Sequence, residues 1–323
     1  MNAPAVEVAG LRKEFRPAGL WGGGNRVLAL DDVGFRLEQG EFAALVGESG
    51  SGKTTLGRVL LGLLPSDAGF VRVVGQDVGR MGRRERKMFR RRAQMVFQSP
   101  YASLNPALRV RSTLAEAVRV HQEDLDRPGV AAEVERLAEL VRLPRGRLDE
   151  FPTSLSGGER RRVGFGRAMA TRPEFVVTDE PVAGLDPPIQ GQLLDLLQRI
   201  HQRREITFLL ISHDLRVVRT LATRVVVLFR GRVLENAPAR AFFTGEARHP
   251  YSQDLLLSAF DAATCMRNHR GVVRQSLAVG GCPYRPRCPI ADVDEDAPCA
   301  TIPPLLKAAG AEHWVACHKR ERL

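Results

Sequence analysis

The sequence predicts an α/β fold built on a largely parallel β-sheet. Short apolar or β-branched runs alternate with helical patterns along the chain, as in successive βα units. The 323 residues, 44% of them hydrophobic, are enough for a well-buried core. The clearest buried strands are predicted at Phe42 to Val46, Phe175 to Thr178, Thr207 to Ile211 and Arg224 to Phe229.

Antiparallel strands are predicted ahead of the first buried strand. Val6 to Leu11 and Asp32 to Leu37 carry strand-like patterns, and the glycine-rich stretch Gly19 to Asn25 lies between them. Because glycine favours turns, this stretch is predicted to be a hairpin tip. The N-terminal part is therefore expected to form a small antiparallel β-subdomain.

Helical segments and a change of composition divide the rest of the chain. Val110 to Leu148 carries charged stretches punctuated by Leu and Val, without strand signals, which predicts a helical insertion within about residues 99–165. Beyond about Thr244, Pro, Cys and His become more frequent. We therefore predict a main domain of residues 1–243 and a C-terminal extension of residues 244–323.

A phosphate-binding loop is predicted between the strand at Phe42 to Val46 and a helical run from Thr54 to Leu64. Residues 47–54 read GESGSGKT, a GxxxxGK[ST] match in the strand-then-helix context that the motif requires. Glycines let backbone N–H groups point inward, Lys53 adds charge for the β- and γ-phosphates, and the Thr54 hydroxyl is a candidate Mg²⁺ ligand. The predicted nucleotide-binding residues here are Gly47, Ser49, Gly50, Ser51, Gly52, Lys53, Thr54 and Thr55.

Two later strands end in polar residues suited to phosphate chemistry. At the end of FVVTDE (residues 175–180), Asp179 is predicted to hold Mg²⁺ through water, and Glu180 to polarise the attacking water as general base. After the strand that ends at Ile211, His213 is predicted to donate a hydrogen bond to the γ-phosphate. Taken alone, the two acids are equally typical of an ordinary strand end, and a lone histidine after a strand is more often structural. Together with the loop, they predict ATP hydrolysis with Lys53, Glu180 and His213 as catalytic residues.

The segment Leu155 to Val163, LSGGERRRV, resembles the signature sequence of ABC ATPases. The resemblance implies a P-loop NTPase (RecA-like) ABC nucleotide-binding domain with an antiparallel β-subdomain, a helical insertion subdomain and a small Cys-rich C-terminal domain. It implies a dimer in which this segment faces the ATP held by the partner subunit, at a helix start. The residues implied to contact that ATP are Ser156, Gly157, Gly158 and Glu159. Glu159 replaces the commoner Gln, and the segment is expected to remain competent for ATP hydrolysis.

Other family elements match at single positions. Gln98 resembles the Q-loop glutamine that reaches Mg²⁺ and couples to the membrane subunit, and Asp186 resembles the D-loop aspartate that communicates across the dimer. Phe15 sits where an aromatic ring would stack on adenine, with an ordinary apolar strand residue as the alternative. Trp21 is a weaker candidate for the same role.

Three stretches narrow the resemblance to the oligopeptide, dipeptide and nickel importer subfamily. They read QSPYASLNP at residues 98–106, HPYSQDLL at residues 249–256 and GCPYRPRC at residues 281–288. The resemblance implies a peripheral subunit on the cytoplasmic side of the inner membrane that powers import of peptides or similar small solutes by ATP-driven dimer closure. The implied partners are two transmembrane permease subunits, a second ABC ATPase subunit and an extracytoplasmic solute-binding protein.

The C-terminal part holds a cluster of four cysteines: Cys282, Cys288, Cys299 and Cys317. The chain shows neither a secretory pattern at its start nor an apolar run of about 18 residues, so a reducing compartment is expected, where clustered cysteines favour metal over disulfides. The spacing C-x5-C-x10-C-x17-C suits Zn²⁺ and a [4Fe-4S] cluster equally, with His313 and His318 as substitute ligands. The subfamily resemblance implies the [4Fe-4S] cluster; unligated reduced cysteines are the remaining alternative.

The net charge of +11 predicts an anionic contact surface. A basic run from Arg80 to Arg92 could meet acidic lipid, a permease or nucleic acid, with a solvated helix face as the alternative. No interleaved aromatic platform accompanies it, so no nucleic-acid partner is expected. The alternative functions are a soluble ABC ATPase acting on nucleic acid or ribosomes, which usually has tandem cassettes or a coiled-coil insertion, and an accessory ATPase of phosphonate breakdown, which would lack the cysteines.

Overall fold

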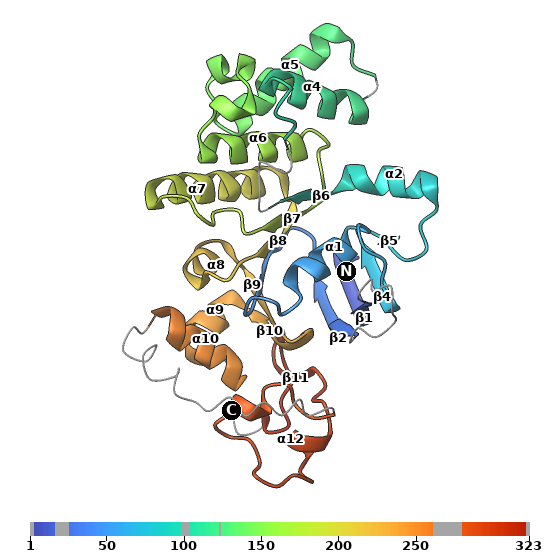
Figure 1. The fold of residues 1–323 in the computed structure, drawn as a ribbon, viewed down its shortest axis with the longest axis vertical. Helices are drawn as coiled ribbons and strands as arrows, with labels where there is room; N and C mark the ends of the chain where they lie inside the picture. The colour runs from blue at the N-terminus through green and yellow to red at the C-terminus, as the bar shows by residue number, and fades with distance from the viewer. Residues whose placement is uncertain (1–2, 17–25, 98–103, 123, 261–279, 321–323) are drawn as a thin grey trace.

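The chain folds around two β-sheets (Figure 1). The structure is a computed structural model that describes residues 3–16, 26–97, 104–122, 124–260 and 280–320. The larger sheet has the strand order β11-β12-β10-β9-β3-β8-β7-β6, and the smaller has the order β2-β1-β4-β5. Helices lie against the larger sheet, which confirms the predicted α/β class.

The centre of the larger sheet is parallel. Its strands are β9 (Arg224–Phe229), β3 (Phe42–Val46), β8 (Thr207–Ile211), β7 (Phe175–Asp179) and β6 (Ala93–Val96). Every residue of β3, β7, β8 and β9 is buried, because layers cover both faces of the sheet. The four predicted buried strands are confirmed, and β7 extends one residue further, to Asp179.

Alternate residues of the central strands belong to two separate cores. Phe42, Ala44 and Val46 pack with the helices that cover one face of the sheet, whereas Ala43 and Leu45 pack with α1 and the smaller sheet on the other face. This alternation is the period of two of a β-strand. The central strands are thus fixed from both sides, which makes their ends a rigid support for loops.

The smaller sheet is antiparallel, as predicted. It consists of β1 (Val6–Phe15), β2 (Val27–Leu37), β4 (Ala68–Val73) and β5 (Gln76–Asp77). β1 and β2 are longer than expected, since they pair from Val6 with Leu37 to Phe15 with Val27. The predicted hairpin tip Gly19 to Asn25 and the adenine candidate Trp21 lie outside the described residues.

The helices are distributed over the insertion and both sheet faces. They are α1 (Lys53–Leu60), α2 (Arg83–Arg92), α4 (Val110–His121), α5 (Arg127–Leu140), η1 (Arg145–Asp149), η2 (Pro152–Ser154), α6 (Gly157–Met169), α7 (Pro187–Arg204) and α8 (Leu215–Leu221). The predicted helical insertion is confirmed. The predicted helix to Leu64 ends earlier because Gly62 takes φ +63°, a left-handed conformation that stops a helix. Within the described ranges, we find no helix with the length and apolarity of a membrane span.

The C-terminal extension continues the larger sheet. β10 (Arg232–Pro238) pairs antiparallel with β9, and then β12 (His313–Val315) pairs with β10 and β11 (Lys307–Gly310) with β12. The remaining elements are α9 (Ala239–Ala241), η3 (Phe242–Glu246), α10 (Pro250–Phe260), η4 (Arg285–Arg287) and α12 (Pro298–Thr301). The division into residues 1–243 and 244–323 stays a prediction.

A buried carboxylate fastens the extension to the sheet. Glu235 of β10 is fully buried; its carboxylate accepts hydrogen bonds from the backbone N–H groups of Arg248 (2.8 Å) and His249 (2.9 Å) and contacts Nε2 of His313 (2.7 Å). Burial alone would raise the pKa of Glu235, but the bonds from His313 and the backbone outweigh it and hold the pKa below its ordinary value. Glu235 therefore stays ionised and holds three segments together.

We expect Glu235→Ala to lower the free energy of unfolding by about 3–5 kcal/mol, because it leaves buried donors without an acceptor. Urea denaturation measures the change. Glu116→Ala, at an exposed position of α4, is the control and should stay within about 0.5 kcal/mol of the unchanged protein. Equal effects of the two substitutions would contradict the fastening role.

Candidate nucleotide site

The loop between β3 and α1 has the conformation of a phosphate cradle, and glycine is required in it. Gly47 has φ +150°, and a Cβ there would lie 2.0 Å from the Leu228 carbonyl oxygen. Gly52, the residue before α1, has φ +105°, and a Cβ there would lie 2.5 Å from the Ala29 carbonyl oxygen. Any side chain would push the loop off β9 or β2, which is why the motif needs glycine at both ends.

Lys53 is folded into this loop. Its Nζ donates to the backbone carbonyls of Gly47 (2.8 Å) and Glu48 (2.7 Å), and the residue is 8% exposed. Burial lowers the pKa of Lys53, while the nearby carboxylates of Glu180 and Asp179 oppose this change. The ammonium is therefore a buried charge within the cradle, with carbonyl oxygens as its hydrogen-bond acceptors.

The ends of β7 and α1 meet at a second polar contact. The Thr54 hydroxyl donates to Oδ2 of Asp179 at 3.0 Å. Burial raises the pKa of Asp179; the bond from Thr54 opposes the rise, and the charge of Glu180 adds to it. A cation between the hydroxyl and the carboxylate would relieve this cost, so the donor set fits Mg²⁺, which takes oxygen ligands.

Glu180 and His213 form a pair at the ends of neighbouring strands. His213 Nδ1 lies 2.6 Å from Oε1 of Glu180, and the His213 backbone N–H donates to the same oxygen at 3.1 Å. An ionised carboxylate only accepts, so Nδ1 carries the proton in this pair. It follows that Nε2 can donate to a phosphate only in the imidazolium form, a condition that the sequence alone did not reveal.

One open cleft of about 820 Å³ brings most of the predicted residues together. It is lined by Ser49, Gly50, Gly52, Lys53, Thr54, Thr55, Asp179, Glu180 and His213, along with Val27, Leu28, Ala29, Ile211, Arg230 and Gly231. Gly47 and Ser51 belong to the same loop but do not line the cleft, and the Ser51 carbonyl accepts a hydrogen bond from the backbone N–H of Gly231 (2.9 Å). The predicted geometry of the loop and both strand ends is thus present in one place.

Sequence reasoning missed Arg230 and the apolar residues Val27 and Leu28. Arg230 directly follows β9, whose carboxyl end lies at the same edge as that of β3. A basic residue after a predicted strand was therefore an available signal. Phe15 does not line the cleft but pairs with Val27, which does, so its adenine role stays a prediction.

The signature segment starts α6 and lies outside this cleft. Ser156 caps the helix: its Oγ accepts from the N–H of Glu159 (3.2 Å), and the Glu159 carboxylate accepts from the N–H of Ser156 (2.8 Å) and from Arg147 (2.9 Å). Burial opposes ionisation of Glu159, but these bonds and the charge of Arg147 outweigh it and lower its pKa. Glu159 can thus fill the capping role of the commoner Gln.

The predicted roles of two residues, Asp186 and Gln98, are not tested by any contact among the described residues. Asp186 precedes α7 and does not line the cleft, and its role across a dimer stays a prediction. Gln98 lies outside the described residues. The strand that leads to it, β6, ends beside β7, since Val96 pairs with Thr178.

The four clustered cysteines line one small cavity with His249 and His318. Burial raises the pKa of Cys282 to about 11, and also raises that of Cys288 and Cys317; the neighbouring thiolates add to this. Within the described ranges, no three His, Cys, Asp or Glu side chains are arranged as metal ligands. His313 is engaged by Glu235, which removes it as a substitute ligand, and Cys265 lies outside the described residues.

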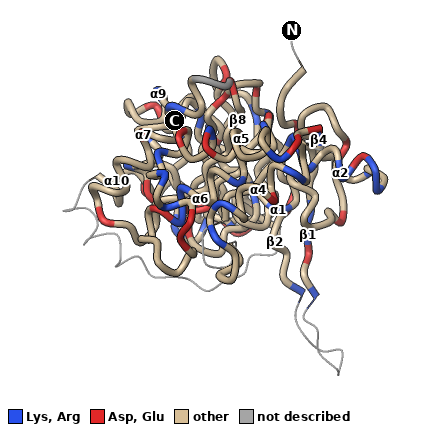
Figure 2. Tube along the Cα trace, turned by 90° about the horizontal axis from the view of Figure 1, so that it is seen from above, with Lys and Arg blue, Asp and Glu red and all other residues tan. Residues whose placement is uncertain are grey.

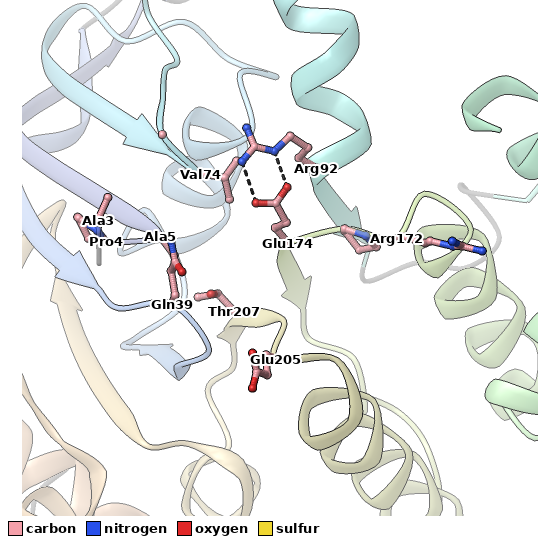
Figure 3. Close-up of a pocket in the computed structure, with 12 residues that line it drawn as sticks. Ala3, Pro4, Ala5, Gln39, Val74, Arg92, Arg172, Glu174, Glu205 and Thr207 are labelled. Atoms are coloured by element: carbon pink, nitrogen blue, oxygen red, sulfur yellow. Dashed lines mark hydrogen bonds and ion pairs between the residues drawn. The ribbon is translucent and has the colours of Figure 1, made fainter. Parts of the chain in front are cut away.

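A second cavity, of about 550 Å³, opens at the opposite edge of the sheet (Figure 3). Glu174 and Thr207 at the amino ends of β7 and β8 line it, and Arg92 forms a bidentate ion pair with Glu174, with the longer contact at 2.8 Å. Ligands of open parallel sheets bind at the carboxyl ends of the strands. The cleft around Lys53 is therefore the candidate site, and this cavity is not.

Comparisons with known proteins agree with this geometry. The sequence model of a family described as ABC transporter matches residues 30–183. Two relatives are named for peptide import and ATP binding. One, from Brucella ovis, is 37% identical over 98% of this chain and 98% of its own; the other, from Brucella abortus, is 41% identical over 92% of this chain and 88% of its own.

Solved structures of similar fold are ATP-binding cassettes. One is the dimeric cassette MJ0796 bound to ADP and Pi, at TM-score 0.66 and 24% identity, covering 73% of this chain and 99% of that one. Another is cbiO1 from Clostridium perfringens, part of the ABC transporter complex cbiONQ, at TM-score 0.66 and 23% identity, covering 76% of this chain and 93% of that one. They share the fold of the cleft-bearing part.

We expect Glu180→Gln to lower the rate of ATP hydrolysis by about 100-fold or more, because a general base is lost while the cleft keeps its shape. ATP affinity should change little. Steady-state phosphate release and equilibrium ATP binding measure the two quantities.

Glu205→Gln, an exposed position on the other cavity, is the matched control and should hydrolyse ATP normally. Undiminished hydrolysis in the Glu180 variant would remove Glu180 from the proposed chemistry.

Proposed function

The chain belongs to the ATPases of the ABC transporter family, and from this premise we propose that it powers a peptide importer. The observation that carries the proposal is the share of this chain that each similar protein matches. The solved cassettes span about three quarters of this chain, 73% and 76%, whereas the relative named for peptide import spans 98% of it. The shared part includes the cysteine-bearing extension, which the alternative of a phosphonate-breakdown ATPase would lack.

Hydrolysis is proposed to follow from the residues gathered in the cleft. Loop N–H groups and Lys53 bind the phosphates and stabilise the negative charge that develops on the transferring phosphoryl group. Glu180 orients the attacking water and accepts its proton, and His213 donates a hydrogen bond to the γ-phosphate. Mg²⁺, when bound by Thr54, Asp179 and Gln98, would neutralise charge on the β- and γ-phosphates.

A second ATPase subunit is proposed to complete each site. Ser156 and the glycines after it lie at the N-terminus of α6, where the helix dipole and the glycine N–H groups suit a phosphate, yet they do not line the cleft of their own chain. The related cassette MJ0796 is dimeric. In a head-to-tail pair, this segment would close over the partner's ATP, and Asp186 would lie near the same interface.

The permease is proposed to dock beside α2. A groove of about 840 Å³ is lined by basic residues of α2, including Arg83, Lys87 and Arg90, and by the apolar residues Met95 and Phe97 at the end of β6. α2 projects from the body and is rich in Lys and Arg (Figure 2). Since Gln98 follows directly, movement of a docked permease helix would reach the nucleotide.

This placement makes the chain a peripheral subunit on the cytoplasmic side of the membrane, with an extracytoplasmic solute-binding protein delivering the peptide. The alternative of a nucleic-acid or ribosome ATPase has only the positive charge in its favour.

The cysteines are proposed to hold a [4Fe-4S] cluster, with Zn²⁺ as the alternative. Four thiols line one cavity, and the Lys319 backbone N–H donates to Sγ of Cys317 at 3.4 Å, a bond that stabilises a thiolate. Basic residues, among them Arg285 and Lys319, also line the cavity and would offset the negative charge of a thiolate-ligated group. The shared cavity and these basic residues are the observations that support the proposal.

Transport by the reconstituted complex tests the peptide proposal. The chain, its permease pair and its solute-binding protein in vesicles should accumulate a labelled oligopeptide only with ATP and only with intact Glu180. ATP hydrolysis that no peptide stimulates, together with co-purifying ribosomes or RNA, would overturn the proposal and favour the alternative.

Metal analysis tests the cysteine proposal. Protein purified without oxygen should be brown and contain about four irons per chain, and Cys288→Ser should lose both the colour and the iron. A colourless protein with stoichiometric zinc would contradict the cluster.

A further inference from the structure

An ion pair joins the phosphate-binding loop to the cysteine-bearing extension. Nη1 of Arg287 lies 2.6 Å from Oε1 of Glu48, across 239 positions of the chain. Glu48 is the second residue of the loop, and its carbonyl accepts one of the bonds from Lys53. Arg287 ends η4 and precedes Cys288, so the contact lies one residue from a candidate cluster ligand.

A second contact fixes the same loop residue. The backbone N–H of Glu48 donates to the Tyr251 hydroxyl at 2.9 Å, and Tyr251 is fully buried in α10. The ring of Tyr284 lies 5.3 Å from that of Tyr251, and the Arg287 guanidinium lies 5.6 Å from the centre of Tyr284. Both the side chain and the backbone of Glu48 are thus held by the extension.

The turn that carries Arg287 is itself well fixed. The N–H groups of Arg285, Arg287 and Cys288 donate to the carbonyls of Cys282, Tyr284 and Arg285, at 3.0, 3.0 and 3.2 Å. Cys282 and Cys288 lie at the two ends of this turn.

We propose that Arg287 is a positioning residue of the phosphate-binding loop, through which the C-terminal extension sets the affinity for ATP. The inference rests on the proposed ATP site but not on peptide as the cargo. Arg287 neutralises the Glu48 carboxylate, which otherwise adds a negative charge to a loop that must bind an anionic triphosphate. It also holds Glu48 outward, so that the loop carbonyl remains oriented toward Lys53.

A double-mutant cycle tests the proposal through affinity rather than turnover. ATP binding is measured with a fluorescent ATP analogue in the Glu180→Gln background, where hydrolysis does not consume it. Arg287→Met should raise the Kd about threefold, the size of effect that a partly exposed ion pair supplies. In the Glu48→Gln background, the same Arg287 substitution should leave the Kd unchanged, because the charge that it neutralises is gone.

Arg240→Met, an exposed arginine of α9, removes the same charge away from the loop and should not change the Kd. An Arg287→Met effect equal in both Glu48 backgrounds would overturn the proposal, since Arg287 would then attract the phosphate directly. An unchanged Kd with Glu48 intact would also overturn it.

If the extension affects ATP binding, then ATP binding must affect the extension to the same extent. This coupling supplies a second readout that a merely structural role would not give. Amide hydrogen exchange of residues 281–288 should slow when ATP binds, and Arg287→Met should abolish that change while Arg287→Lys restores part of it. The same ATP-dependent protection with and without Arg287 would overturn the coupling. Failure of peptide transport would leave both readouts as they are, so the two proposals fail separately.

Discussion

The structure depends on one constraint: the parallel strands β3, β7, β8 and β9 are buried on both faces and end at the same edge. None of these strands can shift without disturbing two cores, because alternate side chains pack on opposite faces. The residues that follow them are therefore held in fixed relative positions. Lys53, Glu180, His213 and Arg230 come from four different strand ends, and the sheet alone brings them into one cleft.

Because these strand ends meet in one cleft, several charged groups lie close together there. A buried lysine, the buried Asp179 and the half-buried Glu180 share the cleft, so burial lowers the pKa of Lys53 and raises that of Asp179. The chain's own groups do not fully offset the cost of burying the charged forms of Lys53 and Asp179. A polyanion on the Lys53 side together with a cation between Thr54 and Asp179 would offset both, which is the electrostatic reason why the site suits a nucleotide bound with its metal.

The sequence was sufficient wherever a local pattern fixes geometry. Continuous apolar runs located β3, β7, β8 and β9, and the glycine spacing located the cradle, because both are local properties. Contacts between distant segments carry no such local pattern. The fastening of the extension by Glu235 and the pairing of Arg287 with Glu48 join residues 13 to 239 positions apart. Arg230 follows a predicted strand, but its place in the cleft depends on β9 lying beside β3, a pairing between distant segments.

ATP is proposed to bind in the cleft around Lys53 and to be enclosed by the α6 start of a second copy. A cryo-electron microscopy structure of the Glu180→Gln variant with Mg²⁺ and ATP tests this most directly. We expect a γ-phosphate contacted by Lys53 of one copy and by the signature segment of the other. Nucleotide bound at the opposite edge of the sheet, or in the cleft of a chain with no second copy over it, would rule out this site.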